Sequence, residues 1–331
     1  MGKCIPPLCG GVYLTKRTFG AKIVRSLQVV NHPIHKIEKN FMLSRHLGFQ
    51  RVIFDCDMTL VAVEGIDELA RLKGQAEHIA DLTRQAMDGI IPLEEVYAKR
   101  LELLRPTRAE LDEVARIYRR TLTPQTAEVI AALQLAGVDV FIVSGGLKAA
   151  VLDLAEMLKI PAQNVHAVSV RLDELSGTWW DYTRHQYAGN PNETYFAFAP
   201  TPLAESNGKL AVVRNLASDG KRTMMVGDGS TDLVTRDVVR LFVGFGGAER
   251  RAVVVEEAAV FINGPGMAGL LPLALSPYAA GKLNGTPLWE FFQDGLQAIK
   301  NGEVLFKDQA HRQRILEAHH NVDHPEQVFG E

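Results

Sequence analysis

Two carboxylates stand two residues apart where a short apolar run ends. Asp55 and Asp57 close the run that begins at Arg51, and its β-rich residues predict a buried strand. Strand alternation would point both acids to one side and Cys56 to the other. Two acids this close do not both ionise easily without a cation, and Mg²⁺ with oxygen ligands is the simplest partner. The pattern indicates a paired-carboxylate site, with a capped turn as the plainer alternative.

A second apolar run ends in a hydroxyl and two glycines. Ser144, Gly145 and Gly146 follow Phe141-Ile-Val and precede a predicted helix. Such a turn exposes backbone N–H groups at a helix start, which suits a phosphoryl group, and Ser144 adds a hydroxyl donor. The plainer alternative is a helix start that Ser144 caps.

A third apolar run ends in acids spaced by glycine, at residues 227–232. Asp228 and Asp232 lie four residues apart and could complete a magnesium site. Upstream, Lys209 opens a helical stretch and could reach a phosphoryl oxygen, although a lone lysine is usually a solvated surface group.

The elements that would position these residues alternate along the chain. Strands are predicted at 51–55, 138–143, 165–170, 223–226, 241–245 and 259–262, with helical stretches between most of them. Residues 66–118 have helical spacing throughout and predict an all-helical insert. Alternating strands and helices favour an α/β fold with a parallel sheet, in which ligands bind at the carboxyl ends of the strands.

Two further segments carry weaker patterns. Residues 177–202 combine Trp, Gly, Pro and polar residues, which predicts a β-hairpin or a long surface excursion. The chain after Pro277 is expected to be helical and packed on the core or on a second subunit. Its histidines, His319, His320 and His324, lack a helical-face spacing, so a solvated tail is favoured over a metal site.

Composition narrows the class of partner. The formal charge of the 331 residues is −3, which implies no basic field for nucleic acid, so a small molecule is the expected partner. No apolar run reaches the roughly 18 to 20 residues that a membrane-spanning helix needs. Three cysteines without a disulfide or metal pattern predict a reducing compartment, hence the cytoplasm. A homodimer is one assembly that the sequence allows.

The segment before the first strand has three open interpretations. It contains no acidic residue before Glu38, yet it carries several Lys and Arg. That composition would suit an organelle transit segment, a folded extension, or an upstream start-site artefact ahead of Met42.

The order and spacing of the three strand ends and Lys209 resemble the haloacid-dehalogenase superfamily of phosphatases. More narrowly, residues 52–271 are similar to the phosphoserine phosphatases, in the form found in animals and some bacteria. The segments that carry this narrower resemblance are 63–70, 160–165, 204–209 and 243–247. The resemblance implies a Rossmann-like core at 48–65 and 120–275, a helical cap at 66–119, and extensions at 1–47 and 276–331.

The resemblance also implies a role for each motif residue. Asp55 matches the nucleophile and Asp57 the general acid and base, while Ser144 and Lys209 match residues that hold the phosphoryl group. Mg²⁺ would be bound by Asp55, the Asp57 backbone carbonyl and Asp228. Three further positions complete the expected site: Gly145 and Thr231 toward the substrate, and Asp232 behind the metal.

Two cap residues match the positions that recognise the substrate. Glu64 would face an ammonium group and Arg100 a carboxylate, which together imply hydrolysis of phosphoserine in serine biosynthesis. The plainer alternatives are a charge near a helix start for Glu64 and an ordinary surface cation for Arg100.

Because this sequence departs from the family pattern at several positions, the resemblance does not determine the shape of the substrate pocket. They are Met58, Leu93, Leu203 and the segment 166–171. The competing functions are therefore a phosphatase for another phosphorylated amino acid or amino alcohol, and a non-catalytic phosphometabolite-binding protein.

Overall fold

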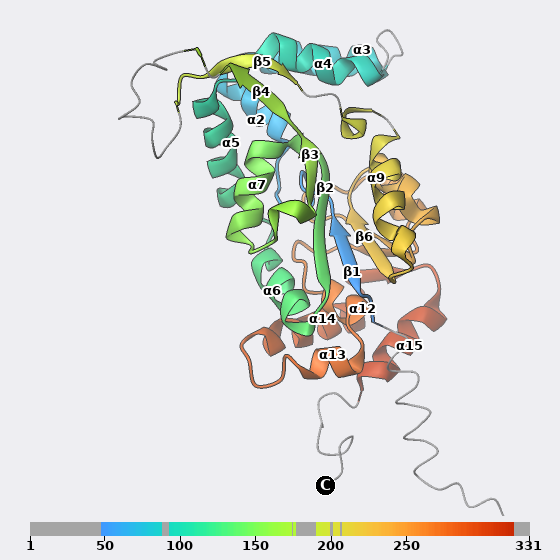
Figure 1. Cartoon of the computed structure of the whole chain (residues 1–331). Coiled ribbons are helices and arrows are strands. Elements are labelled where there is room, and N and C mark those ends of the chain that lie inside the picture. The colour runs from blue at the N-terminus through green and yellow to red at the C-terminus, as the bar shows by residue number, and fades with distance from the viewer. Residues whose placement is uncertain are drawn as a thin grey trace, which may run out of the picture.

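A seven-stranded sheet forms the centre of the molecule (Figure 1). The computed structural model describes residues 48–87, 93–173, 175–176, 190–198, 201–205 and 207–320. The strand order is β3-β2-β1-β6-β7-β8-β9, and every pair is parallel except β8 with β9. The strands are β1 (Arg51–Phe54), β2 (Asp139–Leu147), β3 (Val165–Val168), β6 (Thr223–Gly227), β7 (Leu241–Phe245), β8 (Val260–Ile262) and β9 (Val304–Phe306). The predicted α/β fold with a mostly parallel sheet is confirmed.

The sheet is buried on both faces, which explains its unbroken apolar strands. Val52 and Phe54 of β1 belong to one apolar cluster, whereas Ile53 between them belongs to the other. The first cluster includes α6 (Thr126–Ala136) and α7 (Lys148–Met157), and the second includes α9 (Gly208–Leu216) and α11 (Ala252–Glu257). The smaller helical turns are η1 (Ala162–Asn164), η2 (Pro202–Ala204), η3 (Ala217–Asp219), α10 (Ser230–Leu233) and η4 (Val234–Asp237).

The register of the sheet brings the carboxyl ends of β1, β2 and β6 close together. Phe54 of β1 pairs with Ile142 of β2 on one side and with Val226 of β6 on the other. The residues that follow Phe54 and Val226, and those at the end of β2, therefore lie close together.

Helices alone occupy the described chain between β1 and α6. They are α2 (Gly65–Leu72), α3 (Ala76–Met87), α4 (Leu93–Leu104) and α5 (Arg108–Arg120); α3 and α4 lie beyond the carboxyl ends of the strands, whereas α5 packs beside α7 (Figure 1). A capping box of Thr107 and Glu110 starts α5. The linkers on either side of these helices run together, because the Ala62 N–H donates to the Thr121 carbonyl at 2.8 Å.

A two-stranded arm reaches from the sheet to the helices. Strands β4 (Val170–Asp173) and β5 (Thr194–Phe198) pair antiparallel, so a hairpin-type pairing does form, but its first strand begins before residue 177. The single strand predicted at 165–170 is instead divided between β3 and β4. Glu193 binds Arg108 of α5, with 2.7 Å between Oε2 and Nε.

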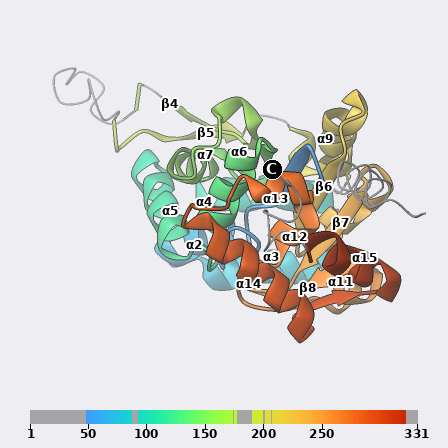
Figure 2. The same ribbon diagram turned by 90° about the horizontal axis from the view of Figure 1, so that it is seen from below.

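The last described segment completes the core at the end opposite α3 and α4. It contains α12 (Leu270–Ala274), α13 (Pro277–Gly281), α14 (Leu288–Asn301), β9 and α15 (Gln309–His319). Figure 2 looks onto this end and shows α13, α14 and α15. The predicted helical packing on the core is found, but the edge strand β9 was not foreseen.

The prediction that the tail histidines are solvated is wrong for His319. Its side chain is buried against the Phe292 ring, and its Nε2 lies 3.0 Å from the Pro272 carbonyl oxygen. His320 is exposed, as expected, and His324 lies outside the described residues, as does the whole segment 1–47. Among the residues that the structure describes, no helix has both the length and the apolarity to cross a membrane.

Candidate active site

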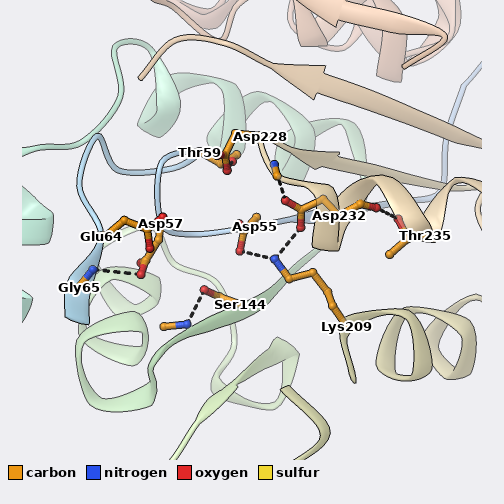
Figure 3. A network of polar contacts seen from close by, with 12 residues as sticks. Asp55, Asp57, Thr59, Glu64, Gly65, Ser144, Lys209, Asp228, Asp232 and Thr235 are labelled. Carbon is orange, nitrogen blue, oxygen red and sulfur yellow. Dashed lines mark hydrogen bonds and ion pairs between the residues drawn. The ribbon is translucent and has the colours of Figure 1, made fainter. Parts of the chain in front are cut away.

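The carboxyl ends of β1, β2 and β6 gather the polar residues that the motifs singled out (Figure 3). Asp55 follows β1, and its N–H donates to the Val226 carbonyl at 2.9 Å, so the ladder positions the backbone of Asp55. Asp228 follows β6 in the same way. Ser144 lies near the end of β2 and is fully buried.

Lys209 lies between two of the acids. Its Nζ is 2.9 Å from Asp55 Oδ1 and 2.5 Å from Asp232 Oδ1, and the side chain is buried. Burial alone would lower the pKa of the ammonium group, but Asp232 and Asp55 outweigh burial and raise it. A Cβ at Gly208 would lie 1.4 Å from the Pro202 carbonyl oxygen, so α9 can start this close to η2 only with glycine.

Asp232 orients Lys209. Its Oδ1 accepts from the ammonium group and its Oδ2 accepts the Gly229 N–H at 3.0 Å. Burial, with the repulsion of Asp55, raises the pKa of Asp232 to about 7. Both oxygens of this carboxyl are thus engaged by protein donors, one of which is the Lys209 ammonium group.

The acids form a group that suits a divalent cation. Oxygens of Asp55, Asp228 and Asp232 lie within 4.8 Å of one another, and all three residues are buried. Thr59 Oγ1 donates to Asp228 Oδ1 at 3.1 Å, and Arg251 Nε lies 2.9 Å from Asp228 Oδ2.

The charges of this group do not balance. Among the described residues, three carboxyls, those of Asp55, Asp228 and Asp232, contact two cations, Lys209 and Arg251. A buried excess of negative charge with oxygen donors is the environment that a hard divalent ion stabilises.

Asp57 is held apart from this group by two donors. The Tyr118 hydroxyl donates to Oδ1, and the Gly65 N–H donates to Oδ2 at 3.0 Å. Burial raises the pKa of Asp57 to about 7, although the Tyr118 hydrogen bond opposes this rise. A carboxyl with this pKa can both give and accept a proton near neutral pH.

Ser144 does not cap a helix. Strand β2 continues through Ser144, Gly145 and Gly146, and α7 begins only at Lys148. The Ser144 Oγ accepts the Gly146 N–H at 2.9 Å, which keeps the hydroxyl at the strand end. The capping alternative is therefore wrong.

A cleft of about 420 Å³ opens beside this site, between the helices and the loop after β7. Glu64 and Arg100 both line it, and Arg100 Nη2 donates to Thr83 Oγ1. Partial burial and the nearby acids Asp57 and Asp55 raise the pKa of Glu64 to about 8. The other lining residues are Met58, Ala62, Val63, Ile66, Asp67, Glu68, Arg71, Thr83, Glu249 and Arg251.

The remaining predicted residues lie outside this lining. Gly145 stays in β2, and Thr231 is exposed on the first turn of α10 beside Asp232.

Sequence reasoning missed two residues that contact the site. Arg251 binds Asp228 and lies 3.7 Å from Glu64, and Tyr118 binds Asp57. Arg251 could have been suspected, because it follows a strand of the parallel sheet in the loop after Gly246-Gly247. Nothing local distinguishes Tyr118 from the other apolar-face residues of α5.

Comparison with known proteins decides the family. A family model described as haloacid dehalogenase-like hydrolase matches residues 49–235. This chain belongs to the haloacid dehalogenase-like hydrolases. Within this family, its relatives are phosphoserine phosphatases. The bovine enzyme is 36% identical over 64% of this chain and 88% of its own length. The chloroplastic phosphoserine phosphatase of Arabidopsis thaliana is 29% identical over 70% of this chain and 75% of its own length.

A solved structure of similar fold points to the same branch of the hydrolase family. It is a substrate-bound phosphoserine phosphatase complex, 26% identical, with a TM-score of 0.51 over 67% of this chain and 97% of that one. The resemblance that the motifs predicted is thus confirmed.

Proposed function

We propose that this hydrolase converts O-phospho-L-serine into L-serine and phosphate through an aspartyl-phosphate on Asp55. The observation that carries the substrate assignment is the shared cleft, whose lining includes both the Glu64 carboxyl and the Arg100 guanidinium. An ammonium and a carboxylate on the same small substrate would pair with these two groups. A substrate without a carboxylate would leave the partly desolvated Arg100 guanidinium without a charged partner on the substrate.

In the first half-reaction, an Asp55 oxygen attacks phosphorus and the bond from phosphorus to the serine oxygen breaks. Asp57, protonated, donates its proton to the departing oxygen, which leaves as a hydroxyl. Lys209 and Ser144 hold the phosphoryl oxygens. Asp55, Asp228 and the Asp57 backbone carbonyl would hold Mg²⁺, which would supply positive charge to stabilise the phosphoryl group.

In the second half-reaction, Asp57 acts as a base. It takes a proton from a water molecule whose oxygen attacks phosphorus, and the bond to Asp55 breaks to release phosphate. The pKa of Asp57 near 7 supports this double role, because neither protonation state is rare at neutral pH.

A substrate panel tests the assignment. Phosphate release should be fastest from phosphoserine and slower from phosphothreonine, phosphoethanolamine and phosphocholine, and it should stop when Mg²⁺ is chelated. Faster release from phosphoethanolamine would favour a phosphatase for amino alcohols. No Mg²⁺-dependent turnover of any of the four would favour a phosphometabolite-binding protein.

Three predictions remain to be tested directly. We infer a cap at residues 66–119 within a core of 48–65 and 120–275, because the two linkers pair between Ala62 and Thr121.

A homodimer is tested by light scattering on the purified chain. A cytoplasmic location is tested by imaging of the tagged full-length protein.

A further inference from the structure

The two donors to Asp57 come from the two ends of the helical insert. Gly65 is the first residue of α2, where the chain enters the helices, and Tyr118 lies in the last turn of α5, where it leaves them. Each donates to a different oxygen of the same carboxyl. The Asp57 carboxyl group is therefore held by hydrogen bonds from both ends of the helical insert.

The linkers themselves are joined. The Ala62 N–H donates to the Thr121 carbonyl at 2.8 Å, and the Thr123 N–H donates to the Leu60 carbonyl at 2.9 Å. Val61 and Leu122 form an antiparallel bridge between these two contacts. Tyr118 thus reaches Asp57 from a backbone segment that is tied to the motif containing Asp57.

The packing around the hydroxyl is specific. Tyr118 is fully buried, and a Cβ at Gly65 would lie only 2.2 Å from its hydroxyl oxygen. Glycine at position 65 therefore makes the space in which the Tyr118 hydroxyl lies beside Asp57. A tyrosine that served only as packing would not need its hydroxyl at this point.

We propose that Tyr118 is a positioning residue that fixes the Asp57 carboxyl for proton transfer, an inference that rests on the proposed function. With one donor on each oxygen, the plane of the carboxyl is set, and each oxygen keeps a second lone pair that can carry the transferred proton. Without the hydroxyl, Oδ1 loses its donor and the carboxyl can rotate away from the leaving oxygen. Proton donation then becomes slower while substrate binding is kept.

The test compares leaving groups in Tyr118→Phe. A serine alkoxide needs a proton to leave, whereas the nitrophenolate of p-nitrophenyl phosphate leaves without one. In single-turnover rapid-quench experiments with Mg²⁺, the variant should release serine about tenfold or more slowly, within the range that acid–base catalysis supplies. Release of nitrophenolate should change less than about threefold, because that step needs little proton donation.

Tyr195→Phe is the matched control. Tyr195 is a buried tyrosine on β5, where its ring lies 5.5 Å from the Arg105 guanidinium, and its variant should release both leaving groups at wild-type rates. If Tyr118→Phe fails to fold, Gly65→Ala is the second variant. Its Cβ would lie 2.2 Å from the Tyr118 hydroxyl oxygen, so it disturbs both donors to Asp57 and should again slow serine release more than nitrophenolate release.

Two outcomes would overturn the inference: an equal loss on both substrates, which marks a structural role, or no loss on either. A different result would contradict the proposed function, namely a wild-type protein that does not hydrolyse phosphoserine. The leaving-group comparison then uses the best alkyl phosphate of the panel. A wild type inactive on every phosphomonoester overturns both claims.

Discussion

At the scale of single residues, the site is an arrangement of acids that would repel one another without cations. Lys209 offsets Asp55 and Asp232, and Arg251 offsets Asp228. Burial, together with the repulsion of Asp55, raises the pKa of both Asp57 and Asp232. The same excess charge that disfavours the metal-free site favours binding of a divalent ion.

Replacing the nucleophile should separate chemistry from folding. Asp55→Asn keeps the side-chain shape but removes the attacking oxygen and one metal ligand, so kcat should fall by about 10⁴-fold or more. Lys209 keeps its contact with Asp232, and one charge leaves the crowded site. The melting temperature without metal should therefore not fall. Substantial phosphate release by a purified, sequence-verified variant would contradict the covalent mechanism.

Metal binding should depend on pH in a defined direction. Burial raises the pKa of Asp57 and of Asp232 to about 7. Their folded-state pKa values lie above those of an unfolded chain, so the metal-free protein binds more protons when folded and loses stability from about pH 4 to pH 7. Negative charge beside the expected ligands favours Mg²⁺, so its stabilising effect should grow as Asp57 and Asp232 ionise over the upper part of this range.

Thermal melting with Mg²⁺ and with a chelator, at several values between about pH 5.5 and 7.5, measures this effect. The difference in melting temperature should increase with pH. A difference that is constant or shrinks with rising pH would show that these carboxyls do not govern metal binding.

At the scale of elements, the sequence predicted the features that depend on residues close together in the chain. Strands β1, β2 and β6 each contain a continuous apolar run, and a reactive residue stands directly after each run, so Asp55, Ser144 and Asp228 were found together. Contacts between distant segments have no such local pattern. Tyr118 reaches Asp57 across 61 residues, and β9 is a three-residue strand inside a charged tail that pairs only because β8 offers a free edge.

The cleft between the helices and the core should determine substrate selectivity. Arg100→Ala removes a charge-assisted contact to the substrate carboxylate, and should cost about 2 to 4 kcal/mol in kcat/KM for phosphoserine. Phosphoethanolamine lacks the carboxylate, so its slow hydrolysis should change little. Glu64→Gln should weaken both substrates, because both carry the ammonium group. Initial rates on the two substrates measure the pattern.

Arg71→Ala is the matched control for Arg100→Ala. Arg71 lines the same cleft but is largely exposed and pairs with Glu68. Its loss should leave the ratio of the two substrates nearly unchanged. Equal losses on both substrates in Arg100→Ala would make Arg100 a structural or phosphate-binding residue.

At the scale of the whole molecule, the chemistry and the C-terminal segment lie at opposite ends of the sheet (Figure 1). Helices α14 and α15 pack beneath α12, and β9 covers the edge of β8, which would otherwise expose unpaired backbone groups. This segment extends beyond the residues that the hydrolase family model matches, yet its side chains belong to the main apolar core. We therefore expect it to act on stability and not on catalysis.

Phe292→Ala tests this division. Phe292 is fully buried on α14, and its ring lies 5.2 Å from that of Trp289 and 5.1 Å from that of His319. Truncation should lower the free energy of unfolding by about 3 to 5 kcal/mol, as measured by denaturant titration. The kcat per folded molecule should stay at the wild-type value. Phe196→Ala, which truncates an exposed ring on β5, should cost little stability. If Phe292→Ala lowered kcat at a temperature where the variant is fully folded, the C-terminal segment would be coupled to the site and the division would be wrong.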